Sequence, residues 1–160
     1  MDPAEPNEKG ARVRFPPPLV FLAGILLGIA GQRFVAAAPV PVARMVGGLG
    51  GLLLLAAGLG LIAWAQRHFT RTGQNPAPWK PSPELLLQGP YRFTRNPMYL
   101  GMTLISIGLG LATDNLWIVL FALLALLTVH LIAVLPEERY LGERFGERYQ
   151  AYRAQVRRYL

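Results

Sequence analysis

The chain has 160 residues, of which 52% are hydrophobic and 16% charged, and it carries a net charge of +7. This apolar content excludes intrinsic disorder, and the lack of cysteine excludes a disulfide scaffold and any Cys-ligated metal or iron–sulfur site. A soluble nucleic-acid-binding protein is disfavoured, because the basic residues do not lie on a polar chain. We therefore expect a single integral membrane domain over residues 1–160, of the all-α class, with about four transmembrane helices, no metal site and no nucleic-acid partner.

The first predicted span follows a polar tail at residues 1–15. Its apolar run, residues 19–31, is interrupted by Arg33 and reaches spanning length only if the helix continues to about Ala38. Basic residues before an apolar run also resemble a secretory signal peptide. The acidic residues of the same tail balance that charge, so we favour an uncleaved first helix.

The second predicted span is residues 45–65, which contain no charge and no proline. At about 1.5 Å per residue, a helix of this length crosses roughly 30 Å, the hydrocarbon thickness of a bilayer. The first two spans therefore fall within residues 16–65. Each contains glycines four residues apart, which let helices approach closely and which we interpret as packing sites: Gly24 and Gly28, Gly47 and Gly51.

A helical hairpin is predicted over residues 99–135, with spans at 99–112 and 116–135 joined by the polar turn 113–115. The first of these spans is short unless its helix begins near Asn96 as the N-cap, with Pro97 in the first turn. The second contains one ionisable residue, His130. An ionisable residue inside a span is a functional candidate by default, so His130 is a candidate base for an acceptor site.

The connection at residues 66–98 is long and rich in proline, and long loops are usually functional or disordered. Lys and Arg are concentrated in this loop and in both termini, whereas only Arg33 and Arg44 lie on the other side of the spans. The positive-inside rule therefore predicts that both termini and this loop are cytoplasmic.

The last segment, residues 136–160, is too charged to cross a bilayer. Apolar and aromatic residues recur every three or four positions, which predicts an amphipathic interfacial helix: Leu141, Phe145, Tyr149, Tyr152, Val156 and Tyr159. This helix is either a membrane-surface anchor or a lid over a site, and the periodicity does not distinguish the two.

Two polar clusters should meet at the cytoplasmic end of the hairpin. The start of the third span offers free N–H groups and Arg95, which favour a carboxylate or phosphate. The end of the fourth span carries the carboxylates of Glu137 and Glu138. Since the hairpin brings both ends together, a zwitterionic or cationic metabolite fits between them.

Several motifs occur here together: GPYRFTRNPMYLG at residues 89–101, the acidic pair at 137–138, Phe-Gly at 145–146, and Tyr149 with Tyr152. Their order and spacing resemble the isoprenylcysteine carboxyl methyltransferase and phospholipid methyltransferase superfamily, from about Pro83 to the C-terminus. The resemblance implies an enzyme that binds S-adenosylmethionine at the cytoplasmic membrane face and methylates a lipophilic acceptor, either an isoprenylcysteine-like carboxylate or a phospholipid amine. It implies that the cofactor contacts are Glu84, Leu85, Leu86, Tyr91, Arg95, Asn96, Pro97, Tyr99, Glu137 and Glu138.

The chain departs from this pattern at two places. Asn96 replaces the usual histidine; asparagine still donates a hydrogen bond but cannot act as a titrating base. The isoprenylcysteine enzymes also have an arginine about one turn before the acidic pair, where residues 132–135 contain none. Its absence favours a phospholipid amine or another small lipophilic acceptor over a prenylated carboxylate. The alternative is a non-catalytic membrane bundle that binds a partner or transports a small solute.

Overall fold

The structure is a computed structural model that describes residues 10–13, 15–73, 75 and 77–159. Throughout these residues the regular structure is helical and no strand occurs, which confirms the predicted all-α class. Most of the predicted tail at residues 1–15 lies outside the described residues, since 1–9 and 14 are not among them.

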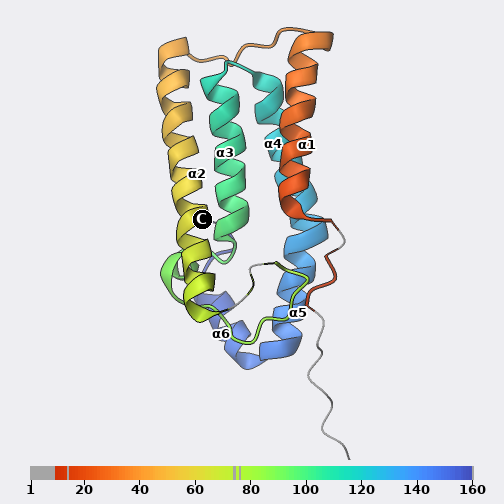
Figure 1. The fold of residues 1–160 in the computed structure, drawn as a ribbon, viewed down its shortest axis with the longest axis vertical. Coiled ribbons are helices and arrows are strands. Elements are labelled where there is room, and N and C mark those ends of the chain that lie inside the picture. Colours follow the sequence, from red (N-terminus) through yellow and green to blue (C-terminus); the bar gives the residue numbers. More distant parts are fainter. Residues whose placement is uncertain (1–9, 14, 74, 76, 160) are drawn as a thin grey trace, which may run out of the picture.

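Long helices lie side by side along the long axis of the molecule (Figure 1). They are α1 (Pro17–Ala30), extended by the π-helical turn η1 (Gly31–Val35), then α2 (Arg44–Thr72), α3 (Pro97–Ala112) and α4 (Leu116–Val129). The π-helical turn η3 (His130–Val134) and α5 (Leu135–Phe145) continue α4 without a break. Within the described chain, three segments are long and apolar enough to cross a membrane, namely Pro17–Val35, Arg44–Thr72 and Leu116–Phe145, and α3 is a shorter apolar helix.

The turn of the hairpin lies where it was predicted, but the second helix does not end at residue 135, because η3 and α5 continue it to Phe145. α3 begins with Pro97 and ends at Ala112, and α4 begins at Leu116 after the turn. Asn115 caps α4 by accepting a hydrogen bond from the Ile118 N–H at 3.2 Å. The prediction of Asn96 as the cap of α3 is only half right: it lies at the N-cap position, but its side chain makes no cap hydrogen bond.

The connection between the second and third predicted spans differs from its prediction. α2 does not end near Ala65 but continues to Thr72, where Gly73 in the left-handed conformation (φ 68°) ends it. The loop is therefore shorter than residues 66–98, and it contains one turn of 3-10 helix, η2 (Gly89–Arg92).

The predicted glycine packing is confirmed. α1 packs on α4 and α2 on α3. A Cβ atom on Gly28 would lie 2.6 Å from the Ile118 Cα, and one on Gly51 would lie 2.5 Å from the Ala112 nitrogen. No side chain fits at either position, because the neighbouring atoms belong to backbone that cannot move aside.

Gly28→Ala should therefore separate α1 from α4 and destabilise the bundle by about 1–3 kcal/mol, the usual cost of overpacking. Gly48→Ala is the matched control, since nothing lies within 4 Å of a Cβ there. Thermal unfolding in detergent should show a lower melting temperature for the first variant only. Equal melting temperatures would mean that the contact between α1 and α4 is looser than described.

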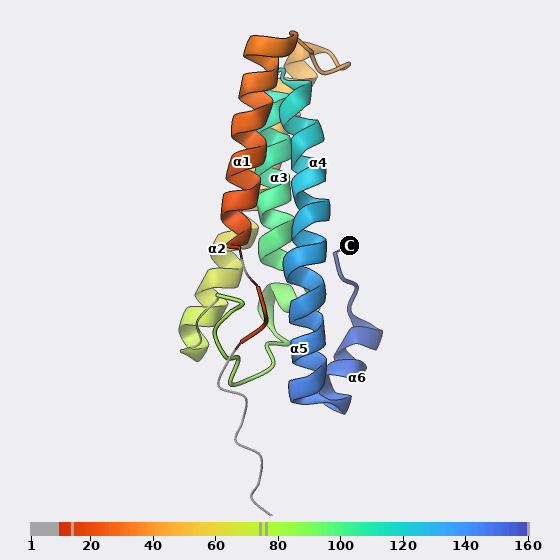
Figure 2. The ribbon, with the colours of Figure 1, turned by 90° about the vertical axis from the view of Figure 1, so that its right-hand side faces the viewer.

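The single tail helix predicted for residues 136–160 is wrong. It is two helices, α5 and α6 (Glu147–Gln155), separated by Gly146 at φ 51° and ψ −126°, a backbone conformation that only glycine adopts readily. From Val156 the chain is extended and runs along the start of α3, where the Arg95 N–H donates to the Arg157 carbonyl oxygen at 3.0 Å. Figure 2 shows α6 and this extended segment against the α4–α5 rod, on the side away from α1.

Candidate functional site

In the part of the chain that the structure describes, two pockets adjoin at the end of the bundle where α2 stops and α3 starts. The larger, the apolar pocket, has a volume of about 210 Å³ and is lined by Pro17, Pro18, Phe69, Asn75, Ala77, Pro78, Trp79, Tyr91, Arg95, Asn96, Pro97, Met98, Tyr99, Met102 and Glu137. The smaller, the polar pocket, has a volume of about 60 Å³ and is lined by Phe69, Ser82, Glu84, Leu85, Leu86, Tyr91, Arg95, Asn96, Glu137, Glu138, Leu141, Tyr149 and Tyr152.

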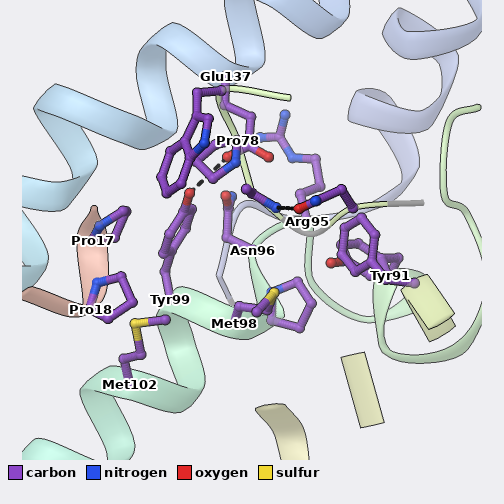
Figure 3. Close-up of a pocket in the computed structure, with 15 residues that line it drawn as sticks. Pro17, Pro18, Pro78, Tyr91, Arg95, Asn96, Met98, Tyr99, Met102 and Glu137 are labelled. Atoms are coloured by element: carbon purple, nitrogen blue, oxygen red, sulfur yellow. Dashed lines mark hydrogen bonds between the residues drawn. The ribbon is translucent and has the colours of Figure 1, made fainter. Parts of the chain in front are cut away.

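Both pockets share one wall, formed by Phe69, Tyr91, Arg95, Asn96 and Glu137. These residues come from four parts of the chain: the end of α2, η2, the residues before α3, and α5. Figure 3 shows the view into the apolar pocket, with Tyr99 reaching from α3 to Glu137, the α1 prolines on one side and Tyr91 on the other.

Glu137 has an unusual environment for a carboxylate. It is enclosed between the pockets, and the Tyr99 hydroxyl donates to its Oε2 at 2.9 Å. No Lys, Arg or His among the described residues forms an ion pair with it. A partly buried carboxylate without an ion-pair partner attracts a cation, because burial strengthens the electrostatic interaction.

Glu138, the next residue, is fully engaged within the protein. Arg158 donates to both of its carboxylate oxygens, from Nε at 2.9 Å and from Nη2 at 2.8 Å. The Arg95 Nη1 atom lies 3.3 Å from the same carboxylate. The side chain of Glu138 is only 10% exposed, so this bidentate pair joins the end of the chain to α5.

Arg95 retains unused hydrogen-bonding capacity. Its side chain is 8% exposed, and its Nε and Nη1 atoms have no hydrogen-bond partner among the described residues. Buried polar groups are almost always paired, so these donors are available to a water, an ion or a ligand in the pocket. The chemistry of the unpaired donors fits an anionic group such as a carboxylate.

Two tyrosines complete the polar pocket. The Tyr152 hydroxyl donates to the Tyr91 carbonyl oxygen at 2.7 Å, which holds α6 against η2. Burial, and then the negative charge of Glu137, raise the pKa of Tyr91, and burial raises the pKa of Tyr152. Both phenols therefore stay neutral at physiological pH and act as hydrogen-bonding walls rather than as bases.

The Asn96 side chain also binds within the protein. Its Nδ2 donates to the Arg158 carbonyl oxygen at 3.1 Å, and the Thr94 hydroxyl donates to the same oxygen at 3.1 Å. Asn96 stands where the family that the sequence resembles usually has histidine. In this chain it holds the C-terminal segment through that hydrogen bond.

The structure brings the predicted cofactor residues together. Eight line the polar pocket, namely Glu84, Leu85, Leu86, Tyr91, Arg95, Asn96, Glu137 and Glu138, and Pro97 and Tyr99 line the apolar pocket. His130 lines neither pocket; its Nδ1 lies 3.0 Å from the Tyr159 hydroxyl oxygen. Sequence reasoning missed Arg158 and the residues from α1 and the loop, because no local motif marks them.

A bundle of helices long and apolar enough to cross a membrane is typical of a membrane protein. The phospholipid methyltransferase family model matches residues 46–148, more than half of the chain, and the chain belongs to this family. The family match indicates a membrane methyltransferase. No curated protein sequence matches the chain.

Proposed function

We propose that this protein transfers a methyl group from S-adenosylmethionine to the amine of a phospholipid or of a similar lipophilic acceptor, at the cytoplasmic face of the membrane. The observation that carries the proposal is the polar pocket. Its lining unites three distant motif segments, at residues 84–86, 91–96 and 137–138, and includes a buried arginine with two nitrogens that make no hydrogen bond among the described residues.

The chemistry of the polar pocket fits the donor. Arg95 would hold the donor's carboxylate, because its Nε and Nη1 atoms make no hydrogen bond among the described residues, although Nη1 lies 3.3 Å from the Glu138 carboxylate. Leu85, Leu86 and Tyr91 offer apolar and aromatic surface to the adenine, and Glu84 at the exposed rim would accept from ribose hydroxyls. When bound, the donor supplies an electrophilic methyl group on a sulfonium, so the protein has only to align the acceptor and exclude water.

Charge favours an amine acceptor over a carboxylate. Glu137 faces both pockets without a counter-ion, so it attracts an ammonium group and repels a prenylcysteine carboxylate. The prolines of α1 and the methionines of α3 give the apolar pocket a lining suited to the chain of a lipid. This lining supports the proposal of a lipophilic acceptor that enters from the bilayer while the donor enters from water.

The proposal predicts binding of the demethylated product. Isothermal titration of the detergent-purified protein with S-adenosylhomocysteine should give a micromolar Kd. Asp114→Asn is the control at the opposite end of the bundle, where asparagine tolerates the positive φ of 52°, and it should bind equally well. A folded sample that releases no heat would contradict the proposal and favour a non-catalytic bundle.

The proposed orientation can be tested by cysteine labelling, because the chain has no native cysteine. Arg71 lies at the site end of the bundle and Arg33 at the other end, and both are exposed. In intact cells, a membrane-impermeant maleimide should label Arg33→Cys at once and Arg71→Cys only after permeabilisation. The opposite pattern would place the site outside the cytoplasm.

A further inference from the structure

We propose that Glu137 is the catalytic base of this enzyme, that the apolar pocket beside it is the acceptor site, and that the neighbouring Glu138 only positions the C-terminal segment. This inference rests on the proposed function, and it divides an acidic pair whose two members the resemblance treats alike as cofactor ligands.

The two carboxylates have different hydrogen-bond and ion-pair partners. Glu138 already receives two hydrogen bonds from Arg158, and Arg95 stands beside it. A ligand ammonium would have to displace a bidentate ion pair to reach it. Glu137 receives only the Tyr99 hydroxyl, so it can accept a further proton or cation without breaking an ion pair.

The two carboxylates also differ in their position relative to the two pockets. Glu137 lies in the wall between the two pockets, whereas Glu138 lines the polar pocket alone. A base for methyl transfer must touch the acceptor while the donor occupies the adjoining site, and Glu137 is the carboxylate that lines both pockets. The Tyr99 hydroxyl fixes the direction of its carboxylate, as second groups do in other base-containing sites.

With Glu137 as the base, every proton and bond of the methyl transfer is accounted for. An amine acceptor arrives as an ammonium, which pairs with the Glu137 carboxylate and gives it one proton. The freed nitrogen lone pair forms the new N–C bond with the donor's methyl group as the C–S bond breaks, and that bond's electron pair remains on sulfur. The product is a methylated ammonium, and Glu137 releases its proton to water when the product leaves.

His130, the sequence-based candidate for this role, is less well placed. It lines neither pocket, and its Nδ1 is already within hydrogen-bonding distance of the Tyr159 hydroxyl. A base there would act on an acceptor outside the two adjoining spaces.

The test separates cofactor binding from proton transfer with Glu137→Gln in the full-length protein. The probes are S-adenosylhomocysteine for binding and vesicles of phosphatidylethanolamine with labelled S-adenosylmethionine for turnover. We expect kcat to fall at least ~100-fold, the lower range of general-base contributions, while the Kd for S-adenosylhomocysteine stays within about threefold of wild type. Glu143→Gln, at an exposed position of the same helix, is the control and should leave both values unchanged.

Two results would overturn the inference: an unchanged kcat, or a loss of S-adenosylhomocysteine binding in a variant that still melts like the wild type. The second result would make Glu137 a cofactor ligand. If Glu137→Gln does not fold, Glu137→Asp keeps the charge but shortens the reach, and it should bind normally with reduced kcat; normal kcat or lost binding would overturn the inference equally. A wild-type protein that binds no S-adenosylhomocysteine would instead refute the proposed function, so the two failures are distinguishable.

Discussion

Replacing Arg95 with alanine should weaken S-adenosylhomocysteine binding by about 100-fold or more. The side chain is 8% exposed, and two of its nitrogens make no hydrogen bond among the described residues, so the ligand's carboxylate would accept the hydrogen bonds that the ion pair with Glu138 leaves unmade. Truncating one partner of a buried, hydrogen-bonded charge pair typically costs 2–5 kcal/mol of binding, and about 2.8 kcal/mol corresponds to 100-fold. Isothermal titration measures the change directly.

Arg92→Ala is the matched control for this loss. Arg92 has the same charge three residues earlier, at the end of η2, but its side chain is exposed and lines neither pocket. It should bind S-adenosylhomocysteine as the wild type does. Equal losses in both variants would show that net charge at this end of the bundle, rather than the buried guanidinium, determines binding.

Replacing Glu138 with glutamine should release the C-terminal segment. The change removes the negative charge and one of the two oxygens that accept from Arg158, so the guanidinium groups of Arg158 and Arg95 lose their counter-charge. Breaking a buried pair from one side usually costs 3–5 kcal/mol, and because Arg158 is 31% exposed we expect about 2–3 kcal/mol here. Hydrogen exchange of residues 147–159 should accelerate while the exchange of α2 and α3 stays unchanged.

Two further variants test whether the faster exchange is specific to the loss of the Glu138 carboxylate. Glu143→Gln removes a carboxylate from the exposed side of α5 and should not alter exchange in the tail. Asn96→Ala removes only the hydrogen bond to the Arg158 carbonyl oxygen and should accelerate exchange less than Glu138→Gln does. A tail that exchanges at the wild-type rate in Glu138→Gln would show that the backbone bonds alone hold it.

The helical hairpin was predictable because its signals are local. Pro97 in a first turn, the polar residues 113–115 and two apolar runs each act within a few residues, and the structure places the helix ends there. The glycine contacts were predictable for the same reason, since small residues four apart mark a close approach whatever the partner helix.

The tail was not predictable from its periodicity. The apolar spacing continues through Gly146 without a change, so it indicates one helix, and the break depends on a backbone conformation that the spacing does not encode. The extended end forms because Thr94, Arg95 and Asn96 supply hydrogen bonds from more than sixty positions away in the chain. A contact of that kind exists only once the bundle has formed.

The sequence predicted which residues lie together at the candidate site, but not which of the two glutamates pairs with an arginine. The resemblance identifies the acidic pair, and the hairpin explains why that pair meets Arg95 and Asn96. Which carboxylate keeps its charge free depends on where Arg158 lies, and nothing near Arg158 in the sequence marks it as a partner of Glu138. The different pairing of the two carboxylates is therefore a property of the folded chain.

Methyl transfer by the purified protein in vesicles tests the central claim most directly. The protein would be reconstituted into phosphatidylethanolamine or phosphatidylglycerol vesicles and supplied with S-adenosylmethionine labelled in its methyl group. The account predicts label in the lipid extract of the amine-containing vesicles, little in the others, and a loss of label with Glu137→Gln. Absence of lipid label from a protein that binds S-adenosylhomocysteine would contradict the claim that this site methylates a lipid amine.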